Sequence, residues 1–340
     1  MTDLLLLGPL GGLLRAALPL GIAGDALFAA SVAFTLFTIG AGFAIVAGWL
    51  ERKTIGRIHS RIGPQYTGPS GSLQTAADAV KFLRKEVIIP EGADHALFKT
   101  APILLLLAPF AALAVIPFGS FTLTDSPYSL VLALALLGLS PVAIIIAAWS
   151  SNSKYSTLGG LRAAGMLMSY EVVLVLAAAS VALTAGTLSI TGIAAFQANN
   201  GLFLYLQPIA AVLFIIALVA NVERNPFDLL EAESELVGGW RTEYGGVWFS
   251  LTLLGEYLKL LASTFLFIHL FLGGAMTRGG DLSFLILTVV VVAFMYAIRA
   301  TAMRLRLDQI LDHVWTRLIP LAILNAAGTI LVLTIVGRGS

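Results

Sequence analysis

The sequence has 340 residues, of which 58% are hydrophobic and only 11% are charged, and its formal net charge is +1. Soluble globular domains are about half apolar and roughly a quarter charged, so this composition excludes an ordinary soluble protein and indicates a membrane protein. The chain has no cysteine, which excludes disulfides, thiolate-held iron–sulfur clusters and cysteine zinc sites. If the protein takes part in redox chemistry, the redox metal belongs to a partner.

Long apolar stretches recur along the chain. A transmembrane helix needs about 20 mostly apolar residues to cross a hydrocarbon core of about 30 Å. The stretches that meet this requirement lie at about 26–50, 101–119, 128–149, 170–190, 204–222, 247–272, 282–298 and 314–336. They are continuously apolar, whereas barrel strands alternate. We therefore expect an all-α polytopic membrane protein, with about eight transmembrane helices in a single membrane domain over residues 1–340.

The first 24 residues are apolar but interrupted by glycine, proline and Arg15. A cleaved signal peptide needs a basic start, and this chain has Asp3 instead, so we expect an interfacial or partly inserted amphipathic segment. Most of the 20 lysines and arginines follow the odd-numbered spans. The positive-inside rule puts these long, basic loops in the cytoplasm and both termini outside.

The loop after span one carries Arg52, Arg57 and Arg61, followed by a turn-rich stretch of glycine and proline. Its last part, LQTAADAVKFLRKE at 73–86, has apolar residues at three- and four-residue spacing, which predicts an amphipathic helix in the membrane interface. The alternative role for the basic residues is to anchor lipid headgroups.

The loop after span three, 148–171, is polar and ends at Tyr170 and Glu171, where span four begins. An ionisable residue at the edge of a span is a functional candidate. The alternative is a carboxylate at headgroup level with no special role.

The segment NPFDLLEAESELVGGWRTEY, residues 225–244, concentrates acid in a chain that is otherwise poor in charge. Pro226 suits the first turn of a helix. Helical spacing would then put Asp228, Glu231 and Glu235 on one face and Glu233 among apolar residues. Carboxylates crowded together and buried exchange protons near neutral pH. The alternative is a solvated acidic face that docks on a basic partner.

Span six contains Glu256 and Lys259 at i, i+3, and later His269. We expect the first two to pair inside the bundle, which a structural salt bridge would also explain. After span seven, Arg299, Arg304 and Arg306 are expected at the cytoplasmic interface. Walker, Rossmann and HExxH motifs are missing from the sequence. Because the chain has no cysteine and two of its four histidines lie in loops at span edges, we expect no metal site. The lack of a repeat weighs against many secondary transporters.

Together, the loops resemble those of the membrane subunit of respiratory complex I that forms the quinone chamber, which is the H-subunit family of the prokaryotic enzyme. The resemblance rests on ERKTIGRIHSRIGPQYTGPSGSLQTAADAVKFLRKE, SSNSKYSTLGGLRAAGMLMSYE, NPFDLLEAESELVGGWRTEY with the following LGEY, and IRATAMRLRLDQI. These stretches are spread over almost the whole chain and occur in matching loops.

The resemblance implies that a quinone is the substrate and that electrons come from an iron–sulfur cluster in a soluble subunit on the cytoplasmic side. Further partners would be small membrane subunits and the lipid bilayer, with no nucleic acid. The residues implied to line or brace the quinone chamber are Arg52, Arg57, Arg61, Phe227 and Arg299. The residues implied to form a proton path are Glu171, Glu223, Asp228, Glu231, Glu233, Glu235 and Glu256. The implied location is a prokaryotic plasma membrane, with a thylakoid-type membrane as the alternative.

Three positions depart from the family pattern. Asn221 stands where many relatives have a carboxylate, Met166 where they have Gln, and Met303 where they have Pro. Three alternative functions stay open: the homologous subunit of an energy-converting hydrogenase or formate hydrogenlyase, a proton-coupled secondary transporter that uses Glu256 and Lys259, and a purely structural anchor for redox subunits. The sequence specifies neither the electron donor nor the type of quinone.

Overall fold

The computed structural model describes residues 22–230, 233–276 and 280–337. These residues form helices, and their only strand-like pairing is a single bridge between Phe118 and Phe121. The longer helices in the first half are α2 (Ile22–Ile58), α3 (Gln74–Arg84), α4 (His95–Val115), α5 (Ser129–Leu137), α6 (Leu139–Ser150) and α7 (Lys154–Ala185). The predicted all-α class is confirmed.

The second half begins with three helices, α8 (Ile190–Asn200), α9 (Phe203–Leu206) and α10 (Pro208–Asn221). They are followed by α11 (Glu233–Leu236), α12 (Gly246–Phe271) and α13 (Gly280–Thr301). The chain then forms α14 (Leu307–His313), one π-helical stretch (Val314–Leu318) and α15 (Ile319–Gly337). Short 3-10 turns lie at Pro69–Gly71, Gly239–Arg241 and Gly274–Met276.

Seven helices among the described residues are long and apolar enough to cross a membrane. They lie at Ala30–Ile58, His95–Val115, Ser129–Ser150, Lys154–Ala185, Gly246–Phe271, Gly280–Thr301 and Leu307–Ile335. The protein is thus a multi-pass membrane protein. The remaining predicted span, 204–222, contains the shorter helix α10, whose 14 residues cover about 21 Å at about 1.5 Å per residue. The predicted N-terminal interfacial segment lies almost entirely outside the described residues.

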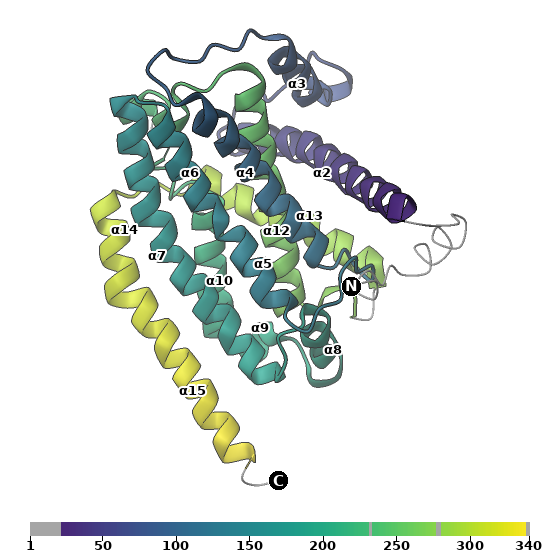
Figure 1. Ribbon diagram of the computed structural model, residues 1–340. Coiled ribbons are helices and arrows are strands. Elements are labelled where there is room, and N and C mark those ends of the chain that lie inside the picture. The colour runs from purple at the N-terminus through teal and green to yellow at the C-terminus, as the bar shows by residue number, and fades with distance from the viewer. Residues whose placement is uncertain (1–21, 231–232, 277–279, 338–340) are drawn as a thin grey trace.

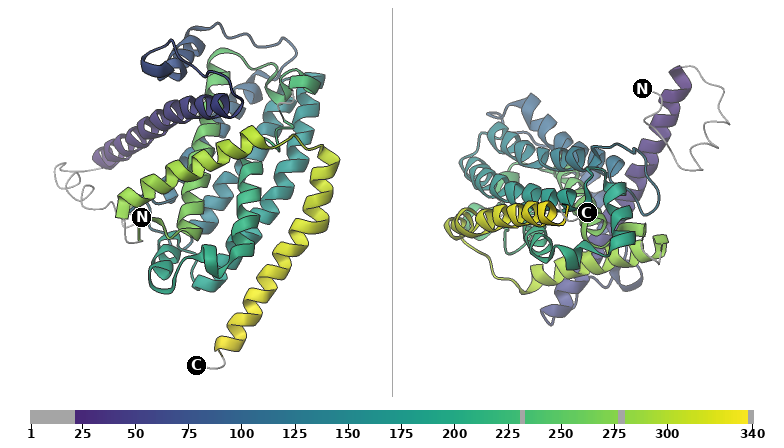
Figure 2. Two further views of the ribbon diagram at one scale, coloured as in Figure 1. Left: turned by 180° about the vertical axis from the view of Figure 1, so that it is seen from behind. Right: turned by 90° about the horizontal axis from the view of Figure 1, so that it is seen from below.

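The helices α4, α6, α7, α10 and α12 form an upright bundle (Figure 1). Seen from behind, α2 and α13 cross the bundle obliquely, and α15 packs on α7 and leans away toward its C-terminal end (Figure 2). Helix α12 lies at the centre, since 78% of its most apolar window is buried, compared with 17% for α2 and for the C-terminal span. A charged residue on α12 therefore needs a partner within the protein.

Helix α7 begins at Lys154, well before the predicted start of span four at about 170. The predicted polar loop is therefore found only at 151–153, and the prediction is wrong for 154–169, which are helical. The reason is close packing. Ser156 donates a hydrogen bond to the Trp240 carbonyl at 2.9 Å, and a Cβ on Gly159 would lie 2.6 Å from the Trp240 backbone nitrogen. This contact holds the turn Gly239–Arg241 in the bundle, with the Trp240 side chain fully buried.

Helix α3 is the amphipathic helix predicted after span one, and it lies beside α2 and α12 at the end of the bundle that carries the long loops (Figure 1). The connection between α2 and α3 turns back on itself. A Cβ on Gly63 would lie 3.0 Å from the Arg52 carbonyl, and Gly71, with φ of 74°, sits directly against the Pro64 backbone. The glycines predicted to form a tight loop therefore position α3 over the end of α2.

Candidate functional site

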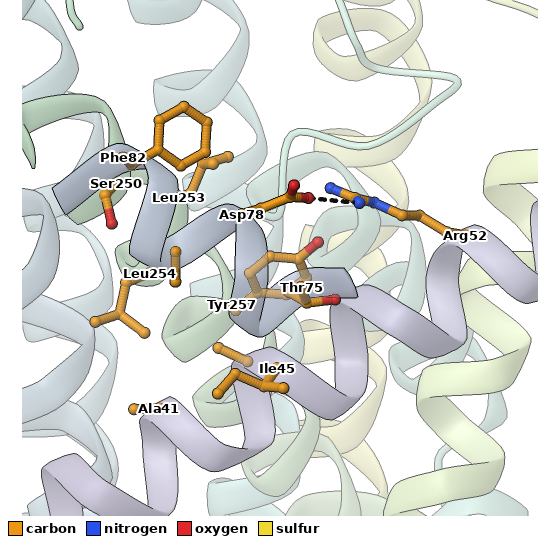
Figure 3. A pocket seen from close by; sticks show the side chains of 12 residues that line it. Ala41, Ile45, Arg52, Thr75, Asp78, Phe82, Ser250, Leu253, Leu254 and Tyr257 are labelled. Atoms are coloured by element: carbon orange, nitrogen blue, oxygen red, sulfur yellow. Dashed lines mark hydrogen bonds and ion pairs between the residues drawn. The ribbon is translucent and has the colours of Figure 1, made fainter. Parts of the chain in front are cut away.

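A pocket of about 220 Å³ lies between α2, α3 and α12 (Figure 3). Most of its wall is apolar, and its lining residues are Ala41, Ala44, Ile45, Arg52, Thr75, Asp78, Ala79, Phe82, Ser250, Leu253, Leu254 and Tyr257. Apolar walls with a few convergent polar groups are typical of small-molecule sites, which usually measure about 300–1,000 Å³. The pocket therefore suits part of a ligand that is mostly apolar.

Arg52 and Asp78 form the charged edge of the pocket (Figure 3). The Arg52 guanidinium bonds to the Asp78 carboxylate at 2.7 Å, and Gln74 donates to the same carboxylate at 3.1 Å. The Arg52 side chain is 47% exposed, so the ion pair contributes only about 0–1 kcal/mol to stability. Its main effect is to join α2 to α3 beside the pocket.

Behind the pocket lies a group of buried and half-buried charges that we call the charge cluster: Glu51, Arg224, Arg241, Glu256 and Arg299. Glu51 is only 3% exposed. It forms an ion pair with Arg299 on α13 and accepts a 2.8 Å hydrogen bond from the Tyr257 hydroxyl on α12. Arg224 lies 3.6 Å from Glu51 and 3.7 Å from Glu256. One guanidinium thus links a carboxylate next to the pocket with one at the centre of the bundle.

Glu256 receives its closest ion pair from Arg241, which the turn Gly239–Arg241 brings into the bundle. Lys259, on the same helix, instead bonds to Glu223 at 3.1 Å. The predicted pair between Glu256 and Lys259 is therefore wrong. Arg241 and Glu223 both belong to the connection between α10 and α12. Each neutralises one buried charge of α12, so Glu256 and Lys259 do not pair with each other.

Glu171 lies near Lys259 and interacts with it electrostatically. Its carboxylate rests against Gly138, the junction of α5 and α6, where a Cβ would lie 2.9 Å from the Glu171 Oε1. The missing side chain at Gly138 therefore gives the carboxylate room. Glu223, Lys259 and Glu171 form an electrostatically linked series inside the bundle, and we call it the inner series.

The acidic segment is not one helix. The described residues 222–230 are irregular, and α11 covers only Glu233–Leu236. The prediction that Pro226 starts a helix with Asp228, Glu231 and Glu235 on one face is therefore wrong. Two of its described carboxylates form ion pairs toward the surface: Asp228 with Arg304 at 3.3 Å and Glu235 with Arg162 at 2.5 Å. We call these two the rim pairs.

The other predicted site residues have different surroundings. Glu231 lies outside the described residues, as does the side chain of Glu233. Arg57 and Arg61 are exposed at the end of α2 and in the following loop. Phe227 is buried against Tyr170, with ring centroids 4.8 Å apart. Of the residues predicted to bind quinone, Arg52 lines the pocket and Arg299 belongs to the charge cluster.

Four residues of this site were not among the sequence candidates: Glu51, Arg224, Arg241 and Tyr257. A signal for two of them exists in the sequence, since Glu51 is a lone acid at the start of the run ERK and Arg224 directly follows Glu223. The remaining two depend on contacts between distant elements. Arg241 reaches Glu256 only because Trp240 is buried against α7.

Tyr244 shows how this region shields polar groups outside the membrane spans. Its ring stacks on Phe98 with centroids 4.2 Å apart, and its hydroxyl lies 3.3 Å from the Phe98 carbonyl, to which it donates. Burial raises the pKa of Tyr244 to about 12. The hydroxyl is thus held inside the protein by its bond to the Phe98 carbonyl, and it does not line the pocket.

Comparison with known proteins identifies the family of the chain. A family model described as NADH dehydrogenase matches residues 30–330. The chain is 41% identical over 319 residues to the H subunit of the NADH-quinone oxidoreductase of Brevibacillus brevis, covering 92% of this chain and 95% of that protein. It is 41% identical over 290 residues to the protein of the same name from Geobacillus kaustophilus, covering 83% and 87%. The corresponding protein of Bacillus thuringiensis is 40% identical over 299 residues, covering 86% and 90%.

The fold and the site define a polytopic membrane protein with a lateral apolar pocket backed by buried ion pairs. The chain belongs to the NADH dehydrogenase family. The resemblance to the H-subunit family, based on its loops, is confirmed.

Proposed function

We propose that this chain is the membrane subunit of a complex I-type quinone oxidoreductase in a prokaryotic plasma membrane. In this proposal it forms the chamber that receives the quinone and links quinone reduction to proton translocation. Its partners are soluble subunits with iron–sulfur clusters on the cytoplasmic side and small membrane subunits. The observation that carries the proposal is the pocket between α2, α3 and α12, which has a residue of the charge cluster directly behind its wall.

The pocket suits a quinone in both shape and chemistry. Much of its apolar wall is formed by residues of α2 and α12 that lie within membrane spans, so a lipid-soluble molecule can reach it from the bilayer. The Arg52 guanidinium and the Thr75 hydroxyl lie among its lining residues, where they can donate to a quinone carbonyl. The volume of about 220 Å³ accommodates a headgroup or a section of the tail, so the molecule would pass through this pocket toward the soluble partner.

The buried charges supply a route by which this chemistry can act on protons. Reduction of a quinone to a quinol takes up two electrons, here from the iron–sulfur partner, and two protons. A negative charge that forms on the quinone during reduction would change the strength of the ion pairs of Glu51 and Glu256. These two carboxylates are buried, so water screens the interaction poorly. From there the inner series Glu223, Lys259 and Glu171 extends the set of ionisable groups through the bundle.

Two buried polar atoms, one on Tyr296 and one on Arg224, support a water-containing route for protons. The Tyr296 hydroxyl and the Arg224 Nε have no hydrogen-bond partner among the described residues. Buried polar groups of this kind are generally satisfied by ordered water, which can also carry protons.

The test begins with the complex that contains this chain, isolated from its native membrane with a tag on the chain. Iron–sulfur subunits and a co-purifying quinone, identified by mass spectrometry, are the expected result. A nickel–iron hydrogenase partner without quinone would instead favour the hydrogenase branch. A chain that purifies without any redox partner would overturn the proposal.

The second part of the test is the variant Arg52→Ala in the isolated complex. It should raise the KM for quinone by about tenfold, as expected for the loss of one charged hydrogen bond in a partly shielded site. Arg306→Ala is the matched control, because Arg306 is exposed, pairs with Asp308 and does not line the pocket. An equal KM in both variants would exclude Arg52 from quinone binding.

A further inference from the structure

Tyr257 belongs both to the pocket and to the surroundings of the charge cluster. Its side chain is part of the pocket wall contributed by α12 (Figure 3). Its hydroxyl donates a 2.8 Å hydrogen bond to the Glu51 Oε2 behind that wall. Tyr257 therefore forms a direct bond from the wall of the pocket to a member of the cluster.

Arg52 provides the contrast. It is the neighbour of Glu51 in the sequence and also lines the pocket, but its guanidinium bonds to Asp78 on α3. Successive residues of a helix point about 100° apart, so Arg52 faces α3 while Glu51 faces α12 and α13. A ligand that acts on Arg52 thus disturbs an exposed ion pair, and a ligand that acts on Tyr257 disturbs a hydrogen bond to a buried carboxylate.

Arg224 connects the acceptor of this hydrogen bond, Glu51, to the second carboxylate of the charge cluster, Glu256. The same Glu51 Oε2 that accepts from Tyr257 lies 3.6 Å from the Arg224 guanidinium, which also lies 3.7 Å from Glu256. The guanidinium further sits over the Tyr257 ring, 5.6 Å from its centroid. Since the two carboxylates are almost equidistant, a small change at Glu51 or at the ring decides which of them Arg224 approaches.

We propose that Tyr257 is a positioning residue that couples occupancy of the pocket to the charge cluster. When a quinone in the pocket displaces the Tyr257 hydroxyl or takes its hydrogen bond, Glu51 loses a donor and draws Arg224 away from Glu256. The ligand thereby shifts the population of two ion-pair arrangements, through its different contacts in each. The inference rests on the proposed function, because it takes quinone as the occupant of the pocket.

The chain leaves room for this contact at Gly48, one helical turn before Glu51. A Cβ there would lie 3.1 Å from the Tyr257 hydroxyl oxygen and 3.0 Å from the Thr75 Cγ2. Real Cβ contacts are rarely this close, so the tyrosine would have to move by a few tenths of an ångström. Gly42, on the same helix, has nothing within 4 Å of a Cβ and therefore offers a matched control.

The main experiment compares Tyr257→Phe with Tyr244→Phe in the isolated complex, with a quinone analogue as substrate. Tyr257→Phe should lower kcat by about tenfold, the scale of one hydrogen bond to a charged group, and change KM by less than about twofold. Tyr244→Phe also removes a shielded neutral hydroxyl, but Tyr244 does not line the pocket and bonds to the Phe98 carbonyl instead, so kcat should stay unchanged. Equal kcat values for the two variants would overturn the inference.

A double-mutant cycle identifies the partner. If Tyr257 acts through Glu51, then Tyr257→Phe should have no further effect on kcat in a Glu51→Gln background, whereas independent effects would multiply. Multiplied effects would overturn the inference. If Tyr257→Phe prevents assembly, Gly48→Ala replaces it, because it displaces the hydroxyl without removing it. It should lower kcat relative to Gly42→Ala, and equal values would likewise reject the inference.

The two proposals fail in different ways. If the wild-type complex does not reduce quinone, the proposed function fails before any variant is measured. If the wild-type complex reduces quinone and Tyr257→Phe behaves like Tyr244→Phe, the proposed function stands and the coupling role of Tyr257 fails.

Discussion

The charge cluster and the rim pairs contain the same kinds of residue, and part of each comes from the connection between α10 and α12, yet their surroundings differ. Glu51 and Glu256 are nearly inaccessible, at 3% and 8% exposure. In the rim pairs the Asp228 and Glu235 side chains are 23% and 48% exposed. Glu51 and Glu256 each have more than one cationic neighbour inside the bundle, whereas the rim carboxylates meet arginines that are themselves about 30% exposed.

The connection between α10 and α12 can therefore serve two purposes. Exposed ion pairs contribute about 0–1 kcal/mol and weaken in salt. Removal of one partner from a buried pair costs about 3–5 kcal/mol, because a charge is left without compensation. The charges of the cluster neutralise one another, so the loss or movement of one side chain changes the ion pairs of several others. The rim pairs can open and close at little cost, which suits an edge that meets a soluble partner.

The largest effect is expected when one partner of the inner series is removed. Lys259→Met leaves Glu223 without its ion-pair partner and removes the positive charge that interacts with Glu171. We expect a loss of stability of about 3–5 kcal/mol. The double variant Lys259→Met with Glu223→Gln should regain much of this loss, because both members of the pair are then neutral. The thermal midpoint of the isolated complex measures both. If the double variant is as unstable as the single one, the unpaired charge of Glu223 is not the cause of the lost stability.

The same double variant separates stability from function. Its regained stability should not restore proton translocation, because two ionisable groups of the proposed route are gone. The number of protons translocated per quinone reduced, measured in vesicles, provides this readout. Normal translocation in the stable double variant would remove Glu223 and Lys259 from the route.

A smaller effect is expected at the contact that brings Arg241 into the cluster. Gly159→Ala forces a Cβ toward the Trp240 backbone nitrogen, which would lie 2.6 Å away. Overpacking of this kind costs about 1–3 kcal/mol. A Cβ at Gly165, on the same helix, would approach its nearest neighbour only to 4.0 Å, so Gly165→Ala should be neutral or stabilising by up to about 1 kcal/mol. Similar thermal midpoints for the two variants would show that the close approach of α7 to Trp240 does not matter.

The sequence predicts most of the fold, because long apolar stretches have essentially one solution in a bilayer. The helices α2, α4, α12 and α13 and the amphipathic helix α3 follow from apolar content and spacing. The start of α7 does not. Its first two turns contain glycines and polar residues that are typical of a loop, and their helical state depends on packing against Trp240 and α6, the first of which lies far away in the sequence.

The sequence predicts only some members of the site and little of their arrangement. Glu256 and Lys259 were recognised as buried ionisable residues, but local spacing favours pairing along the helix, whereas Arg241 and Glu223 reach both from another segment. Glu51 was overlooked for the same reason: its partners come from α12, α13 and residue 224. Which charges meet is a property of tertiary contacts, and a pattern within one helix does not contain it.

The smallest effect on stability is expected at the rim, where it separates two roles of the acidic segment. Glu235→Gln and Arg162→Ala break the same ion pair, and each should cost less than about 1 kcal/mol, so the complex should assemble in both. If Glu235 carries protons, Glu235→Gln alone should lower quinone reduction and proton translocation, since Arg162→Ala leaves the carboxylate in place. An equal loss in both variants would instead identify the ion pair as a docking contact. In that case the acid at the rim serves to hold a partner, and proton transfer is confined to the buried carboxylates.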